Sequence, residues 1–168
     1  LGDFQEYGVT LNRFFVTTIV KPDGDPQYEK FKELHFRQYA DIEEAKKPQF
    51  FYINGIKIGF VAANRSEKYI FTPEATKDSP GVLRTYDSAE YLKVIKKAKK
   101  ECDYLVAYVH WGTEDSNVVA DYQKEMGREY IDAGADAIVG GHPHTLQGVE
   151  YYKGHPIAYS LGDFWFNN

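Results

Sequence analysis

Three of the five histidines in this chain lie directly after two apolar runs. His110 follows DYLVAYV at residues 103–109, and His142 and His144 follow DAIVGG at residues 136–141. Imidazole nitrogen is a common ligand of Zn, Fe, Mn and Ni, and a metal held in this way can activate water. These residue types therefore indicate a metal site that supports hydrolysis, if the fold brings them together.

The two apolar runs are typical of buried strands, and residues 117–135 between them predict a helix that ends at Gly134. A strand, a helix and a strand in this order form a parallel crossover unit. Residues that follow parallel strands emerge at one edge of the sheet, where open α/β folds bind ligands. Pro143 excludes regular helix, and in an extended chain residues two apart face the same side. We therefore expect the three imidazoles at one edge.

The structural alternative is that His110, beside Trp111, is a hydrogen-bonded core residue, and a His-x-His pair alone has low specificity. Convergence of three histidines favours the metal interpretation. We expect two other histidines to stay outside the site, because His35 lies in a predicted helix and His155 in a predicted turn.

Carboxylates normally complete such a site, and three are candidates. Glu114 and Asp115 lie in the loop after His110. Asp163 reaches the same edge if the last strand lies beside residues 136–141, whereas a turn stabilised by its own side chain is an equal alternative.

The remaining segments are predicted from capping, turn and periodicity signals. We expect a helix with Asp25 as N-cap, a short helical turn before Pro48, and a hairpin over residues 49–63 around Asn54-Gly55. A loop is expected over residues 64–86. It is followed by a helix with a capping box of Asp87 and Glu90 and a solvated lysine face, and the last predicted element is a hairpin around Lys153-Gly154.

Composition bounds the class of protein. The chain has 168 residues, 43% of them hydrophobic, and a net charge of −5, which predicts one folded domain and no basic surface for nucleic acid or anionic membranes. Cys102, the single cysteine, excludes an internal disulfide and is expected to be a buried, inert thiol. The opening LGDFQEYGVT lacks a Met and a signal region, so we expect an excised piece whose targeting is not visible.

Several motifs resemble one bacterial family. HWGTED at residues 110–115 and YIDAGADAIVGGHPHTLQGVEYYKGHPIAYSLGDFWF at 130–166 resemble the signature half of the CapA family of capsule and poly-γ-glutamate synthesis proteins, in the calcineurin-like metallophosphoesterase superfamily. EEAKKPQFFYINGIKIGFVA at 43–62 resembles that family's central hairpin. The resemblance covers about residues 41–168, whereas the first 40 residues match poorly.

The resemblance implies an α/β fold, a layered sandwich of mixed sheets flanked by helices, with residues 1–168 as a single, partial domain that lacks its N-terminal strands. It also implies His110, His142 and His144 as ligands of a divalent transition metal, Mn, Fe or Zn, in a centre that is binuclear in the complete domain. The family's Gly-Asp strand end and Asn-Asn-His turn are not found before residue 41, and Asp163 stands where the family usually has Asn.

Two functions follow as hypotheses. In the first, the chain belongs to a capsule or poly-γ-glutamate synthesis protein that hydrolyses a phosphoester, with His144, Asp163 and Glu114 as catalytic residues. In the second, it is a non-catalytic binding or scaffold protein for an anionic cell-surface polymer, favoured by the missing ligands and by the 16% of aromatic residues. Both imply an extracytoplasmic, exported or membrane-tethered protein whose partners include a phosphorylated small molecule or poly-γ-glutamate and other capsule-synthesis membrane proteins.

Overall fold

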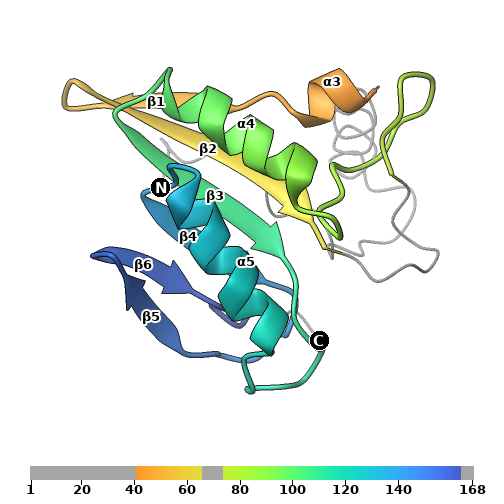
Figure 1. Cartoon of the computed structure of the whole chain (residues 1–168), viewed down its shortest axis with the longest axis vertical. Coiled ribbons are helices and arrows are strands. Elements are labelled where there is room, and N and C mark those ends of the chain that lie inside the picture. The colour runs from red at the N-terminus through yellow and green to blue at the C-terminus, as the bar shows by residue number, and fades with distance from the viewer. Residues whose placement is uncertain (1–40, 66–73, 164–168) are drawn as a thin grey trace, which may run out of the picture.

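The computed structural model describes residues 41–65 and 74–163, which form one mixed sheet in the order β1-β2-β3-β4-β6-β5 (Figure 1). The strands are β1 (Gln49–Ile53), β2 (Ile56–Asn64), β3 (Tyr104–His110), β4 (Ala137–Gly141), β5 (Val149–Tyr152) and β6 (His155–Ala158). The helices are α3 (Ile42–Ala45), α4 (Ala89–Lys99) and α5 (Asp121–Asp132). The α/β class expected from the sequence is confirmed; the resemblance implies a sandwich of sheets, and the described residues contain one sheet.

The two predicted hairpins form the two edges of the sheet. Asn54 and Gly55 have φ angles of 51° and 82°, the positive values that a tight turn between β1 and β2 requires. Lys153 and Gly154 turn in the same way between β5 and β6, at 52° and 84°. β2, β3, β4 and β6 between these turns run parallel to one another.

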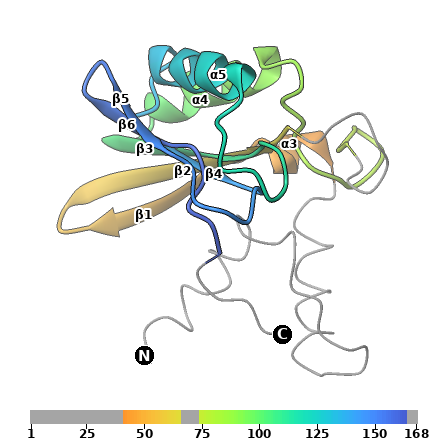
Figure 2. The same cartoon turned by 90° about the horizontal axis from the view of Figure 1, so that it is seen from below.

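The parallel strands arise because α4 and α5 carry the chain back along one face of the sheet (Figure 2). Alternate residues of β3 point toward these helices, and Leu105, Ala107 and Val109 are fully buried there. Trp111 and Tyr130 extend this core toward the carboxyl ends of the strands, with stacked rings. The predicted crossover is therefore confirmed, and it directs the chain after β3 and after β4 to the same edge.

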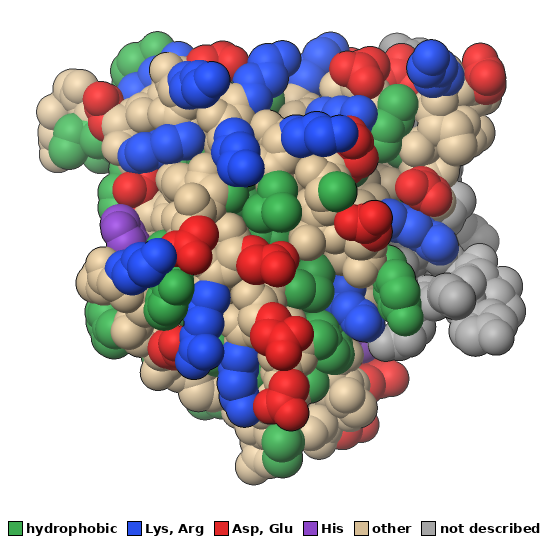
Figure 3. Space-filling view, viewed as in Figure 1, with side chains coloured by type: hydrophobic (Ala, Val, Ile, Leu, Met, Phe, Trp, Pro, Cys, Tyr) green, Lys and Arg blue, Asp and Glu red, His purple; other side chains and the backbone are tan. Residues whose placement is uncertain are grey.

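The start of α4 differs from the sequence prediction. Asp87 accepts the backbone N–H of Ala89 in a local turn, so the helix begins after Ser88 without a side-chain cap. Glu90 forms ion pairs with Lys93 and with Lys46 from the segment after α3, and the predicted capping box is absent. The exposed lysines of α4 are Lys93, Lys96 and Lys97, and the exposed Lys100 follows the last residue of the helix. Lys and Arg side chains gather on this face (Figure 3).

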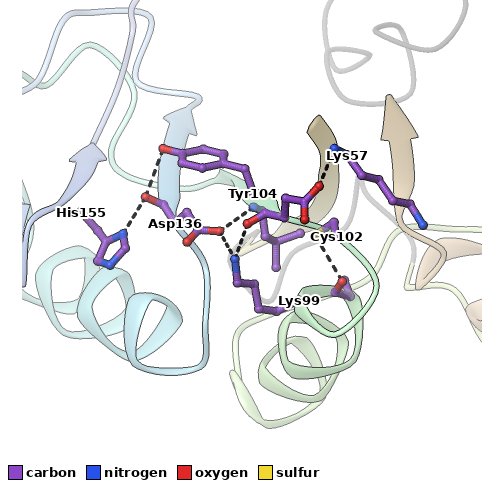
Figure 4. Close-up of polar contacts among 9 residues, drawn as sticks. Lys57, Lys99, Cys102, Tyr104, Asp136 and His155 are labelled. Carbon is purple, nitrogen blue, oxygen red and sulfur yellow. Dashed lines mark hydrogen bonds and ion pairs between the residues drawn. The ribbon is translucent and has the colours of Figure 1, made fainter. Parts of the chain in front are cut away.

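A polar cluster around Asp136 fixes the opposite, amino-terminal edge of the sheet (Figure 4). The Asp136 carboxylate accepts the Leu105 N–H and an ammonium N–H of Lys99, both at 2.7 Å. His155 lies in the first position of β6 rather than in the turn, with Nδ1 3.1 Å from the Asp136 carbonyl oxygen. Cys102 is half-buried, its thiol donates to the Ala98 carbonyl oxygen, and burial raises its pKa.

Some predictions lie outside the described residues, namely the helix capped by Asp25 and the place of His35. The loop predicted over 64–86 is described in part, and it is tied to the sheet by short bridges that pair Asn64 with Arg84 and Glu74 with Val82. No helix in the described part of the chain has the length and apolar character needed to cross a bilayer.

Candidate functional site

The parallel register brings the three predicted histidines together at the carboxyl edge of the sheet. His110, the last residue of β3, lies beside Gly141, the last residue of β4, so that His142 follows at once. The ring centroids of His110 and His142 are 4.5 Å apart, and those of His142 and His144 are 6.2 Å apart. The convergence expected from the crossover is therefore present in the fold.

The backbone that carries the pair is not extended, contrary to the sequence prediction. His142 and His144 have φ angles of 106° and 59°, which residues other than glycine rarely adopt. Pro143 between them is buried, and its carbonyl oxygen accepts the Asp115 N–H. Gly112 leaves room for this turn, because a Cβ there would lie 2.7 Å from the Pro143 ring. The two imidazoles approach each other through a strained bend, the kind of backbone found at functional sites.

Glycines at the end of β4 allow close packing beneath the histidines. A Cβ on Gly141 would lie 2.5 Å from the Tyr108 hydroxyl. A Cβ on Gly140 would meet the Tyr159 carbonyl group and Nε1 of Trp111, which donates a hydrogen bond of 2.8 Å to that same carbonyl oxygen. Residues with side chains at these positions would push the strand end, and the histidines after it, away from the neighbouring strands.

Asp163 reaches the site by the route that the sequence suggested. β6 pairs parallel with β4, and the chain after it continues beside the histidine turn through the bridge of Leu146 with Leu161. Oδ1 of Asp163 lies 2.9 Å from Nδ1 of His144. The carboxylate therefore orients this imidazole, which favours the first of the two alternatives expected for Asp163.

The side chains of the other two carboxylate candidates make fewer contacts with the histidines than Asp163 does. Glu114 and Asp115 are exposed, and within residues 41–65 and 74–163 the Glu114 carboxylate forms no hydrogen bond or ion pair. Its charge acts on His142, whose pKa it raises against a larger lowering by burial. Glu114 lies close enough to influence the site electrostatically, while Asp115 contributes its backbone N–H.

Burial keeps two of the imidazoles neutral at pH 7. The pKa of His110 is lowered to about 4, chiefly because burial disfavours the charged ring and also because His142 and His144 lie nearby. The pKa of His142 is lowered for the same main reason. A neutral imidazole keeps a nitrogen lone pair for a metal ion or a hydrogen-bond donor.

The donor chemistry of this edge fits a divalent transition metal, but the set is incomplete. Within the described ranges, no three His, Cys, Asp or Glu side chains are arranged to hold one ion. Two buried side-chain oxygens at the same edge have no hydrogen-bond partner, Oδ1 of Asn64 and Oγ1 of Thr145. Buried polar atoms without partners are rare, and they commonly mark a place where an ion or a water binds.

Sequence reasoning missed two residues at this edge. Asn64 ends β2 directly beside His110, and the signal for it was a polar residue that closes an apolar strand. Arg65 follows, with its backbone N–H donating to the His110 carbonyl oxygen. Its guanidinium lies over the rings of Tyr122 and Tyr86, 3.8 and 4.6 Å from their centroids. This contact holds a permanent positive charge against Tyr122 and Tyr86, beside the carboxyl end of β2.

Comparison with known proteins places these motifs in a family. Residues 34–168 match the model of the bacterial capsule synthesis protein PGA_cap. The chain is 39% identical over 129 residues to the PGA biosynthesis protein CapA of Bacillus subtilis (strain 168), covering 77% of this chain and 33% of that protein. It is 34% identical over 131 residues to the capsule biosynthesis protein CapA of Bacillus anthracis, covering 76% and 31%.

A more distant relative is the probable polyglutamine synthesis accessory protein of Mycobacterium tuberculosis, 30% identical over 115 residues, covering 63% of this chain and 29% of that protein. A solved structure of a hypothetical protein from Thermus thermophilus aligns with a TM-score of 0.43 at 19% identity, covering 68% of this chain and 38% of that one. The chain spans about a third of the length of the curated relatives. On the family match and the shared motifs, this chain belongs to the bacterial capsule synthesis protein family PGA_cap.

Proposed function

We propose that this chain carries part of a metal-dependent phosphoesterase site that serves capsule or poly-γ-glutamate synthesis. The observation that supports it is the convergence of His110, His142 and His144 at one sheet edge, with Asp163 2.9 Å from His144. The names of the relatives support the biological setting, since they are described as PGA and capsule biosynthesis proteins. A divalent Mn, Fe or Zn ion bound here, in a binuclear centre in the complete domain, would supply an activated water and neutralise phosphoryl oxygens.

The contacts of each side chain support a separate role in the proposed site. His110 and His142 offer neutral imidazole lone pairs, because burial lowers the pKa of both. Asp163 lies 2.9 Å from Nδ1 of His144 and orients this ring, which is proposed as a metal ligand and as the group that transfers a proton to the leaving group. Glu114 is positioned to modulate His142, because its charge raises the pKa of that ring.

The test is hydrolysis of an aryl phosphate by the intact protein with Mn²⁺, comparing His142→Ala with wild type. His155→Ala is a matched control, because that ring lies at the opposite edge of the sheet against Asp136. Loss of turnover in His142→Ala alone is expected, with activity falling at least about a hundredfold, as for removal of a catalytic group. Equal turnover in all three proteins would overturn the proposal.

A second function is favoured by the incomplete donor set of the described residues. In this alternative the histidine edge contributes to non-catalytic binding of an anionic cell-surface polymer such as poly-γ-glutamate. The relative from Bacillus subtilis, named a PGA biosynthesis protein, supports this setting. Retention of labelled poly-γ-glutamate by the intact protein in excess chelator, without phosphatase activity, would favour this alternative. For either function, we propose that the protein lies outside the cytoplasm. It would be exported, or tethered to the membrane beside other capsule-synthesis membrane proteins.

A further inference from the structure

The outer side of α4 carries a row of four exposed lysines, which we call the lysine stripe: Lys93, Lys96, Lys97 and Lys100. Their spacing of three and four residues places the side chains on one side of a helix, and the last of them keeps helical backbone angles as the C-cap. The opposite side of α4 is buried against the sheet through Tyr91, Val94, Ile95 and Ala98. The stripe therefore faces away from the core (Figure 3).

Most of the stripe has no carboxylate to neutralise it. Lys93 forms an ion pair with Glu90, whereas the other three lysines form no ion pair or hydrogen bond with any residue that the structure describes. The cations beside α5 differ, because each of them is paired with a carboxylate, namely Lys124 with Asp121, Arg128 with Glu150 and Lys153 with Asp132. Local pairing is thus present on the neighbouring helix and missing along the stripe.

This arrangement works against the stability of α4. Like charges three and four residues apart on a helix repel each other and destabilise it. The helix dipole favours cations in the last turn, which offsets part of the repulsion, but Lys93 lies about two turns from the end. The chain as a whole has a net charge of −5, so the stripe is a local concentration of positive charge. Such a concentration attracts anions from solution.

The form of the stripe indicates the kind of anion. None of the exposed large hydrophobic side chains of the described residues belongs to α4, whereas helices that bind membrane surfaces insert an apolar face. Ammonium groups are point charges on flexible stems, so they favour many loose contacts over one bidentate contact. Four of them extend over about 10 Å of helix, at a rise of about 1.5 Å per residue. A linear polymer with a carboxylate on every repeat is complementary to this row.

We propose that the lysine stripe of α4 binds a linear polycarboxylate, with poly-γ-glutamate as the polymer of this class that the name of the Bacillus subtilis relative supports. The inference rests on the biological setting of the proposed function, but not on its metal or its chemistry. Lys100 leads to the first residue of β3, at the amino edge of the sheet, whereas the histidines lie at the carboxyl edge. Polymer binding and the proposed hydrolysis therefore have separate surfaces.

The experiment measures fluorescence anisotropy of labelled poly-γ-glutamate with the intact protein in excess chelator, at low and at physiological salt. The α4 variant is Lys96→Gln/Lys97→Gln/Lys100→Gln, in which glutamine keeps the helix propensity and circular dichroism checks the fold. Its affinity at low salt should fall about tenfold or more, since each exposed ionic contact contributes a small factor. Wild-type affinity should fall as salt screens the lysines.

The matched control removes the same charge from lysines that are already paired with Glu44, Asp121 and Asp132: Lys47→Gln/Lys124→Gln/Lys153→Gln. This control should bind the polymer within about twofold of wild type, because its lysines are neutralised in the fold. Equal losses in both triple variants would show a dependence on net charge alone and would overturn the stripe as a site.

Three further outcomes are decisive. Unchanged polymer affinity in the α4 variant would overturn the inference and leave the histidine edge as the candidate for polymer binding. Binding of wild type to phosphatidylglycerol vesicles but not to the polymer would assign the stripe to a membrane and also overturn it. Aryl phosphate turnover by the α4 variant should equal that of wild type, so loss of polymer binding with normal turnover supports the stripe. Absence of turnover in wild type would overturn the proposed hydrolysis and leave the polymer result standing.

Discussion

Replacement of Gly140 by alanine tests the close packing beneath the histidine turn. A Cβ at this position would lie 2.8 Å from the carbonyl carbon of Tyr159, and nearer still to its oxygen and to Nε1 of Trp111. β4 must therefore move away from the chain after β6, which breaks the 2.8 Å hydrogen bond between the Trp111 indole and the Tyr159 carbonyl. Overpacking costs about 1–3 kcal/mol, and an unpaired buried group costs about as much again.

The expected loss in free energy of unfolding is about 2–5 kcal/mol, or roughly 5–15 °C in melting temperature for a domain of this size. Urea titration followed by tryptophan fluorescence measures it, with Gly148→Ala as control. A Cβ on Gly148 meets nothing within 4 Å, so that variant should match wild type or gain up to about 1 kcal/mol. If Gly140→Ala unfolds within about 0.5 kcal/mol of wild type, the packing argument is wrong.

Three further substitutions test separate contacts. Asp136→Ala removes the acceptor of a strand N–H and of Lys99, and should cost about 1–3 kcal/mol in urea titration without changing metal affinity; a changed affinity would show that the two sheet edges are coupled. Asp163→Asn keeps an oxygen for His144 and should retain phosphatase activity within about threefold, whereas Asp163→Ala should lose about 10–100-fold, and equal activities would exclude the orienting role. Tyr91→Phe removes a hydroxyl that donates to two carbonyl oxygens and should lower stability by about 1–2 kcal/mol in thermal unfolding; an unchanged midpoint would contradict this.

The elements that position the site were predictable because their signals are local. Asn54-Gly55 specifies a hairpin through two positive φ angles, and two apolar runs separated by a helix specify a parallel crossover. From that crossover alone, the common edge for His110 and the His142–His144 pair follows. The approach of Asp163 required one more assumption, that the last strand pairs with β4, and the register of β6 confirms it.

The parts that sequence reasoning missed depend on long-range contacts or rare backbone states. Glu90 matches a capping box by spacing, yet Lys46 from a distant segment competes for it. No sequence rule assigns positive φ to His142, since the bend there is imposed by the packing of Pro143 against the loop after β3. Asn64 lies beside His110 because of the register between β2 and β3. The sequence does not show this register, because the segment after Asn64 has no helix or strand periodicity.

A titration of the metal-stripped intact protein with Mn²⁺ and with Zn²⁺, with bound metal counted by elemental analysis, tests the histidine edge most directly. The geometry predicts saturable binding that the His110→Ala/His142→Ala double variant loses and that His155→Ala retains, because His155 lies at the far edge against Asp136. Failure of the wild-type protein to take up either ion, or equal uptake by the double variant, would contradict a metal centre formed by these rings.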